Sequence, residues 1–168
     1  MPHSDGDNKP WAIGKIAEIN PATVLDVGAG AGIWSDIITK ICPSVTIDAI
    51  EAWEPYIGEF DLTGKYNNVF LKDAREHDDF NYDLVIFGDV LEHMSEEDAV
   101  ALWGRAKSQA KYAIISVPII HYPQGPHAGN PYEVHVVEDW TTEKVLKAFS
   151  DIVDYKELTV TGIYLAKF

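Results

Sequence analysis

The first residues whose types and spacing could do chemistry lie in a glycine-rich run, residues 24–32, which reads Val-Leu-Asp-Val-Gly-Ala-Gly-Ala-Gly. Gly28, Gly30 and Gly32 alternate with other residues, and without a Cβ they let the backbone turn sharply and approach a ligand. Asp26 precedes the first glycine by two residues. A carboxylate there favours a ligand with a positive charge and an amino group, whereas it would repel a pyrophosphate.

Acidic residues also follow the next two apolar runs. Glu51 comes about 20 residues after the last glycine, the interval at which an acid after the second strand of a nucleotide-binding fold meets ribose hydroxyls. One carboxylate can accept hydrogen bonds from both hydroxyls. Trp53 beside it either covers an adenine ring or fills the surface of the sheet. Asp73 follows the third apolar run, where it is either a ligand-binding acid or an ordinary turn residue.

The spacing of the glycines separates this run from the dinucleotide-binding pattern. That pattern is G-x-G-x-x-G, and here Ile33 stands at the position of its third glycine. The G-x-G-x-G run after an acid resembles motif I of the class I S-adenosylmethionine-dependent methyltransferases, and residues 88–93 resemble their motif IV. The resemblance covers residues 9–168 and is specific for cofactor and fold, but not for the methyl acceptor.

The resemblance implies roles for individual residues. Asp73 would accept from the adenine amino group, the backbone N–H of Ala74 would meet a ring nitrogen, and the backbone at Gly88 and Asp89 would pass under the methionine part of the ligand. The cofactor-binding residues expected in this way are Asp26, Gly28, Ala29, Gly30, Glu51, Ala52, Trp53, Asp73, Ala74, Gly88 and Asp89.

Two histidines are candidates for the methyl-transfer step. In-line displacement at a sulfonium methyl group needs the acceptor held near the methyl carbon, sometimes with a base for its proton. His93 follows the fourth predicted strand, and His135 lies in a long loop, residues 118–139, that is rich in rings. We predict that this loop forms the acceptor pocket, with His93 or His135 as base. The alternative is that His93 caps the following helix and that the loop histidines are surface residues.

A divalent metal is a further possibility at the same place. Asp89-x-x-Glu92-His93 and the downstream His135, which precedes Trp140-Thr141, resemble the E-x-x-E-H pattern of small-RNA 2′-O-methyltransferases and of ubiquinone-pathway O-methyltransferases. In those families carboxylates and histidines hold a metal that orients the acceptor oxygen. Asp89 departs from the pattern, which has Glu there, so the sequence assigns no metal.

Apolar periodicity predicts the elements that must position these residues. Helical spacing predicts a helix around residues 13–17 that stops at Asn20-Pro21, one over residues 33–41, one capped by Ser95, and one over residues 142–149 after Thr141. Short apolar runs predict strands at residues 23–27, 45–50, 69–71, 83–87, 112–117, 152–158 and 163–168. Between the third and fourth strands there is room only for a turn.

Alternation of strands and helices predicts a parallel sheet, and the last two strands are joined too closely for a crossover helix. The fold class expected is therefore α/β: a three-layer sandwich with a mostly parallel seven-stranded sheet, in which strand 7 is antiparallel. The resemblance implies the strand order 3-2-1-4-5-7-6. Residues 1–9 are expected to form a flexible tail, and residues 10–168 a single methyltransferase domain.

Composition limits the classes of molecule that the protein is expected to bind. The chain has 13 Lys+Arg and 27 Asp+Glu, a net charge of −14, which repels nucleic acid and anionic lipid surfaces. No apolar stretch is long enough to span a membrane, and the only cysteine, Cys42, fits a reducing cytoplasm. We therefore expect a cytoplasmic protein that acts on a small molecule; the sequence predicts no oligomeric state.

The function expected is S-adenosylmethionine-dependent transfer of a methyl group to oxygen or nitrogen of a small-molecule acceptor, with S-adenosylhomocysteine as the other product. A noncatalytic cofactor-binding domain is the main alternative. A nicotinamide-dependent oxidoreductase is disfavoured by Asp26, by Ile33 and by the terminal hairpin.

Overall fold

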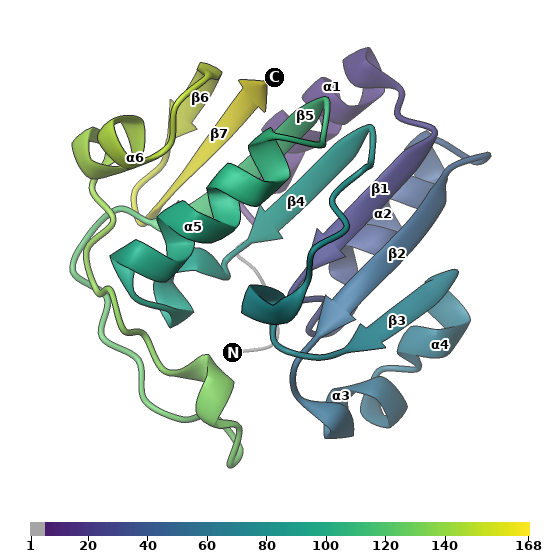
Figure 1. The fold of residues 1–168 in the computed structure, drawn as a ribbon, viewed down its shortest axis with the longest axis horizontal. Coiled ribbons are helices and arrows are strands. Elements are labelled where there is room, and N and C mark those ends of the chain that lie inside the picture. Colours follow the sequence, from purple (N-terminus) through teal and green to yellow (C-terminus); the bar gives the residue numbers. More distant parts are fainter. Residues whose placement is uncertain (1–5) are drawn as a thin grey trace.

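A computed structural model of the protein describes residues 6–168, which form one seven-stranded sheet with helices on both faces (Figure 1). The strands are β1 (Thr23–Val27), β2 (Thr46–Glu51), β3 (Asn68–Leu71), β4 (Leu84–Gly88), β5 (Tyr112–Pro118), β6 (Ile152–Glu157) and β7 (Thr161–Lys167). Their order is β3-β2-β1-β4-β5-β7-β6, with β1 to β5 parallel and β7 antiparallel to both neighbours. The predicted fold class and strand order are confirmed.

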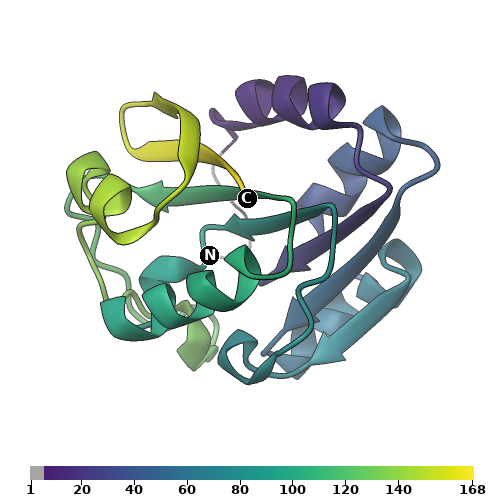
Figure 2. The same cartoon turned by 45° about the horizontal axis from the view of Figure 1, so that its top comes forward.

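The helices divide between the two faces of the sheet (Figure 2). One face is covered by α1 (Lys9–Ile19), α2 (Ile33–Ile41), α3 (Glu54–Glu59) and α4 (Leu62–Lys65), and the other by α5 (Glu96–Lys107) and α6 (Thr142–Ala148). Three single turns of 3-10 helix complete the elements: η1 (Ala74–Glu76), η2 (Leu91–His93) and η3 (Pro131–Glu133).

Each face of the sheet has its own apolar core because side chains alternate along a strand. In β1, Leu25 and Val27 pack in the core under α5, whereas Val24 packs in the core under α1 and α2. The same alternation turns Asp26 toward the second core, where it is fully buried.

Several predicted helix ends are confirmed by their capping contacts. α1 stops at Asn20, which has the left-handed backbone of a helix C-cap, with φ at 47°. Ser95 accepts a hydrogen bond from the backbone N–H of Asp98, and Thr141 accepts one from that of Lys144. The link from β3 to β4 contains only the single turn η1, as expected.

Two features differ from the sequence prediction. Helices α3 and α4, between β2 and β3, were not predicted; both are short, and neither has the length over which an apolar stripe shows. At the other end of the chain, Asn8 and Lys9 are buried, and Lys9 opens α1, although we placed both in the tail. Residues 1–5 of the tail lie outside the described residues.

Within residues 6–168, none of the helices is both long enough and apolar enough to cross a bilayer.

Candidate active site

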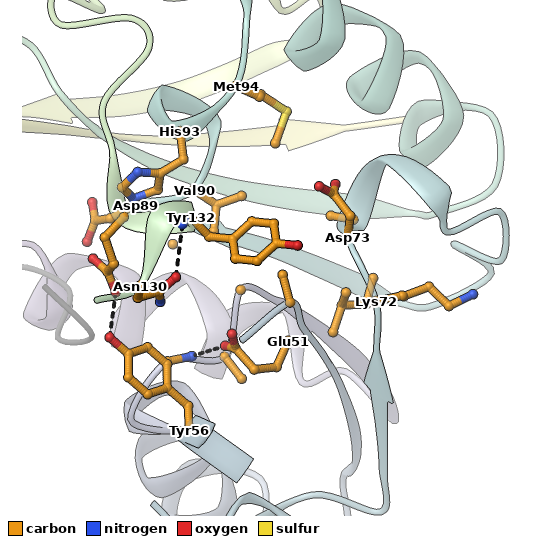
Figure 3. Close-up of a pocket in the computed structure, with 18 of the residues that line it drawn as sticks. Glu51, Tyr56, Lys72, Asp73, Asp89, Val90, His93, Met94, Asn130 and Tyr132 are labelled. Atoms are coloured by element: carbon orange, nitrogen blue, oxygen red, sulfur yellow. Dashed lines mark hydrogen bonds between the residues drawn. The ribbon is translucent and has the colours of Figure 1, made fainter. Parts of the chain in front are cut away.

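A pocket opens at the carboxyl ends of the parallel strands, the edge where open α/β sheets bind ligands (Figure 3). It collects most of the residues that the sequence singled out for a cofactor. Those in its walls are Gly28, Ala29, Gly30, Glu51, Ala52, Asp73, Ala74, Gly88 and Asp89. They come from the ends of four different strands, so the parallel sheet alone brings them together.

The glycine turn forms the floor of the pocket. Backbone N–H groups of Gly28 and Ala29 both donate to the carbonyl of Ile50, at 2.9 and 3.1 Å, which ties the turn to the end of β2. Gly28 has a φ of +72°, and a Cβ there would collide with the side chain of Val90. This position therefore requires glycine for both conformation and space.

Glu51 is the buried acid beside this turn. Its Oε2 accepts from the backbone N–H of Gly30 at 2.9 Å, and its Oε1 accepts from that of Trp53 at 2.7 Å. Burial raises the pKa of Glu51, although both of these hydrogen bonds oppose the rise. Each carboxylate oxygen keeps a further lone pair, so the group can still accept from a ligand hydroxyl.

Asp26 and Trp53 were predicted to bind the cofactor, but neither lies in the wall of the pocket. Asp26 points into the core below the glycine turn, where it accepts a hydrogen bond from the hydroxyl of Tyr66. Burial raises the pKa of Asp26 to about 7. Trp53 packs its half-buried ring against the core that α1 and α2 cover.

Asp73 and Ala74 stand at the far side of the pocket, after β3. Arg75 holds the carboxylate of Asp73 from two directions: its Nε donates to Oδ1 at 2.9 Å and its Nη2 to Oδ2 at 2.6 Å. These hydrogen bonds lower the pKa of Asp73, so this acid is ionised at neutral pH. It is therefore available as an acceptor for an amino group of a ligand.

Asp89 lies where this pocket meets a second one. It has a φ of 58°, a strained backbone conformation for a residue other than glycine, of the kind that clusters at functional sites. Ser116 holds both the backbone and the side chain of Asp89. The Ser116 carbonyl accepts from the Asp89 N–H at 2.9 Å, and the Ser116 hydroxyl donates to Oδ1 of Asp89 at 2.9 Å. Asp89 and His93 line both pockets, so the two cavities share a wall.

The second pocket brings His93 and His135 together although they lie far apart in the sequence. Their ring centroids are 4.9 Å apart. The Nδ1 atoms lie 3.1 Å from the carbonyl of Val134 and 2.6 Å from that of Tyr122, respectively. A carbonyl can only accept, so each Nδ1 carries the proton and each Nε2 keeps a free lone pair.

Burial keeps both histidines neutral. It lowers the pKa of His93 to about 4, and it lowers the pKa of His135 as well. His93 does not cap the following helix, since Ser95 does. Of the loop histidines, His135 is buried, whereas His121 and His127 are exposed surface residues outside both pockets, as the alternative had it.

Glu92 completes a group of three side chains that could hold a cation. One ligand atom each from Glu92, His93 and His135 lies within 4.8 Å of the others. Glu92 is 1% exposed, and its Oε2 has no hydrogen-bond partner. Burial, and next the charge of Asp89, raise the pKa of Glu92. Two imidazoles and a carboxylate form a donor set that suits divalent transition metals, and the backbone carbonyls that orient the imidazoles are typical of metal sites.

Several side chains of the first pocket were not predicted from the sequence. Tyr56 comes from the unpredicted helix α3, while Asn130, Tyr132 and Glu133 come from the long loop after β5. The dipeptide Glu54-Pro55, which opens α3, was the available signal for that helix, because Pro and an acid are favoured in the first turn. No local signal marks which residues of a long loop return to a distant pocket.

Comparison with solved structures places this architecture among methyltransferases. A putative O-methyltransferase from Nostoc punctiforme matches with a TM-score of 0.73 at 16% identity, over 96% of this chain and 56% of its own. An S-adenosylmethionine-dependent methyltransferase from Clostridium acetobutylicum matches with a TM-score of 0.70 at 15% identity, over 98% and 93%. Human N-acetylserotonin methyltransferase, solved in complex with S-adenosylmethionine, matches with a TM-score of 0.69 at 15% identity, over 95% and 51%.

This chain spans about half the length of the Nostoc and human proteins. No model of a known protein family and no curated protein matches the sequence. The similarity therefore lies in the fold: the chain has the fold of the class I S-adenosylmethionine-dependent methyltransferases.

Proposed function

We propose that this protein is an S-adenosylmethionine-dependent methyltransferase that methylates oxygen or nitrogen of a small-molecule acceptor and releases S-adenosylhomocysteine. The observation that carries the proposal is the shared wall of Asp89 and His93 between the pocket at the glycine turn and the second pocket. Methyl transfer needs this arrangement, because donor and acceptor must meet at one point while each is bound separately. The free cysteine fits the expected cytoplasmic location.

The cofactor would lie along the first pocket. Glu51 would accept from the ribose hydroxyls, Asp73 from the adenine amino group, and the backbone at Gly28 and Gly88 would face the methionine part. A cationic sulfonium near Asp89 is also favoured by the charge of the Asp89 carboxylate, while Lys72 and Arg75 line the first pocket on the side of Asp73.

The acceptor would enter through the second pocket. A lone pair of its oxygen or nitrogen attacks the methyl carbon, and the carbon–sulfur bond breaks with its electron pair left on sulfur. The acceptor proton passes to a free Nε2, that of His93 or of His135. Both rings are neutral at pH 7 and have an unprotonated Nε2, and their lowered pKa makes each a weaker base than free imidazole.

The same side chains fit a divalent cation. Glu92, His93 and His135 would hold it, and the buried Oε2 of Glu92 would gain the partner it lacks. Such a cation, when bound, lowers the pKa of an acceptor hydroxyl and orients its oxygen. Metal analysis of protein purified without chelator or added metal, followed by an EDTA challenge, tests for it. Protein that is free of metal and fully active in EDTA would assign proton acceptance to the histidines alone.

The cofactor assignment is tested by thermal denaturation with S-adenosylhomocysteine, with Glu51→Gln as the variant and Glu59→Gln as the control. Glu59 is an exposed acid of α3 outside the pocket. Saturating ligand should raise the Tm of the wild type and of Glu59→Gln, and Glu51→Gln should need about 10-fold more ligand for the same shift. Equal shifts in all three proteins would contradict the role of Glu51.

Transfer of a labelled methyl group separates catalysis from mere cofactor binding. With a panel of hydroxyl and amine acceptors, we expect labelled product from the wild type and loss of label from the donor. Binding of S-adenosylhomocysteine without turnover of any acceptor would favour the noncatalytic domain.

A further inference from the structure

The loop between β5 and α6 reaches both pockets. We call residues 119–139 the bridging loop. Its residues Asn130, Tyr132 and Glu133 line the first pocket, whereas Gln124 and His135 line the second. Apart from the turn η3, it has no helix or strand of its own, so individual contacts with the rest of the protein hold it in place.

One end of the bridging loop is attached to the cofactor side of the protein. The hydroxyl of Tyr56 donates to Oε1 of Glu133 at 3.1 Å, and both side chains are buried. Tyr56 belongs to α3, which begins three residues after Glu51. Beside this contact, Oδ1 of Asn130 accepts from the backbone N–H of Tyr132 at 2.9 Å, and the Tyr132 ring extends over the pocket toward Asp73 and Glu51 (Figure 3).

The other end is attached to the acceptor side. Backbone N–H groups of Val136 and Val137 both donate to the carbonyl of Glu92, at 2.8 and 3.1 Å. In the opposite direction, His93 donates from Nδ1 to the carbonyl of Val134. Residues 134–137 therefore hold the turn that carries Glu92 and His93.

Gln124 links the two ends. Its side-chain Nε2 donates to the backbone carbonyl of Glu133 at 2.7 Å. The backbone carbonyl of Gln124 accepts from the backbone N–H of His135 at 3.0 Å. A second, longer contact of 3.4 Å runs from Nε2 to Oε2 of Glu133. A shift of Glu133 would therefore be passed to His135 through Gln124, from its side-chain amide to its backbone carbonyl.

We propose that Glu133 is a positioning residue that couples the two pockets. Held by Tyr56, it keeps Tyr132 over the cofactor and, through Gln124, sets His135 in the acceptor pocket. A ligand under Tyr132 stabilises this end of the bridging loop and thereby its other end, so bound cofactor strengthens acceptor binding, and bound acceptor strengthens cofactor binding by the same factor. The inference rests on the proposed function, because it takes S-adenosylmethionine as the ligand of the first pocket.

The test is amide hydrogen exchange with and without S-adenosylhomocysteine, in the wild type, in Tyr56→Phe and in a matched control, Tyr82→Phe. The control also loses one hydrogen bond from a tyrosine hydroxyl to a carboxylate, that of Tyr82 to Asp48 at 2.8 Å, but away from both pockets. In the wild type and the control, the ligand should slow exchange at Val136 and Val137. In Tyr56→Phe it should bind about 3- to 10-fold more weakly, and the slowing should be lost.

A double-mutant cycle with Glu133→Gln separates positioning from general loss of structure. If Tyr56 and Glu133 act as a pair, the double variant should lose no more affinity for S-adenosylhomocysteine than the worse single variant, whereas additive losses would overturn the pairing. Binding by the wild type with unchanged exchange at Val136 and Val137 would overturn the coupling alone. No binding by the wild type would overturn the proposed function, and this inference with it.

Discussion

The two pockets are built in different ways. The walls of the first come mainly from strand ends and backbone, at the glycine turn and at the ends of β2, β3 and β4. Half of the residues that line the second come from the turn η2 and the bridging loop, and only two of the others, Pro118 and Thr161, belong to strands. A sheet with a fixed strand order can therefore keep one cofactor pocket, while changes in loop and turn residues alter what the other pocket accepts.

The largest effect that tests the separate roles of the two pockets is expected from removing a side chain that lines only the second pocket. His135→Ala should lower methyl transfer about 100-fold or more, because a positioned proton acceptor or ligand is lost. Its affinity for S-adenosylhomocysteine should stay close to that of the wild type. Turnover of labelled donor and calorimetry measure the two effects.

The exposed His127 is the control for that variant, since it belongs to the same loop but lines neither pocket. His127→Ala should keep full turnover. If His135→Ala and His93→Ala both turned over as fast as His127→Ala, the second pocket would not be the place of the reaction.

The converse change alters only the first pocket. Gly28→Ala should weaken binding of S-adenosylhomocysteine by about 10-fold or more and lower the free energy of unfolding by about 1–3 kcal/mol, because its φ of +72° and the contact with Val90 both disfavour a Cβ. Urea denaturation and calorimetry measure these losses.

Gly58→Ala is the matched control, because a Cβ at this position in α3 meets no atom within 4 Å. It should leave binding unchanged and should not destabilise the protein. Comparable losses in both glycine variants would show that the turn has no special role.

Asp26 gives an effect that appears in the pH dependence of stability rather than in binding. Its pKa is raised to about 7 by burial, so between about pH 4 and pH 7 the folded protein holds a proton that the unfolded chain has released. Stability from this group is therefore full below the unfolded pKa and is lost as the pH rises toward 7. Asp26→Asn should remove this loss, which is at most about 4 kcal/mol, in urea denaturation followed from pH 5 to pH 7.5.

Asp61→Asn, at an exposed position, serves as the control and should keep the pH dependence of the wild type. A flat stability profile in the wild type itself would show that Asp26 is not held protonated below the glycine turn.

The strands could be predicted from short apolar runs, and their order was implied by the family resemblance that the glycine turn carries. Residues such as Glu51 and Asp73 could be placed at the pocket because parallel strands bring their carboxyl ends to one edge. Alternation along β1 puts the side chain of Asp26 on the same buried face as Val24. Its charge and the resemblance to motif I led us to predict that it contacts the ligand instead.

The rest of the site depends on tertiary contacts that leave no local pattern. Tyr56 and Glu133 meet across 77 positions of sequence, and His93 is oriented by the carbonyl of Val134 across 41. Neither α3, with six residues, nor the bridging loop has a periodicity that would place its side chains. Such contacts are determined by the path of the bridging loop over the folded sheet.

The most direct measurement of the central claim is calorimetric titration of the wild-type protein with S-adenosylhomocysteine and, separately, with NADH. Our account predicts one site per chain for S-adenosylhomocysteine and no measurable heat with NADH, since the turn at Gly28 lacks the third glycine of the dinucleotide pattern. Tight binding of NADH together with no binding of S-adenosylhomocysteine would contradict it.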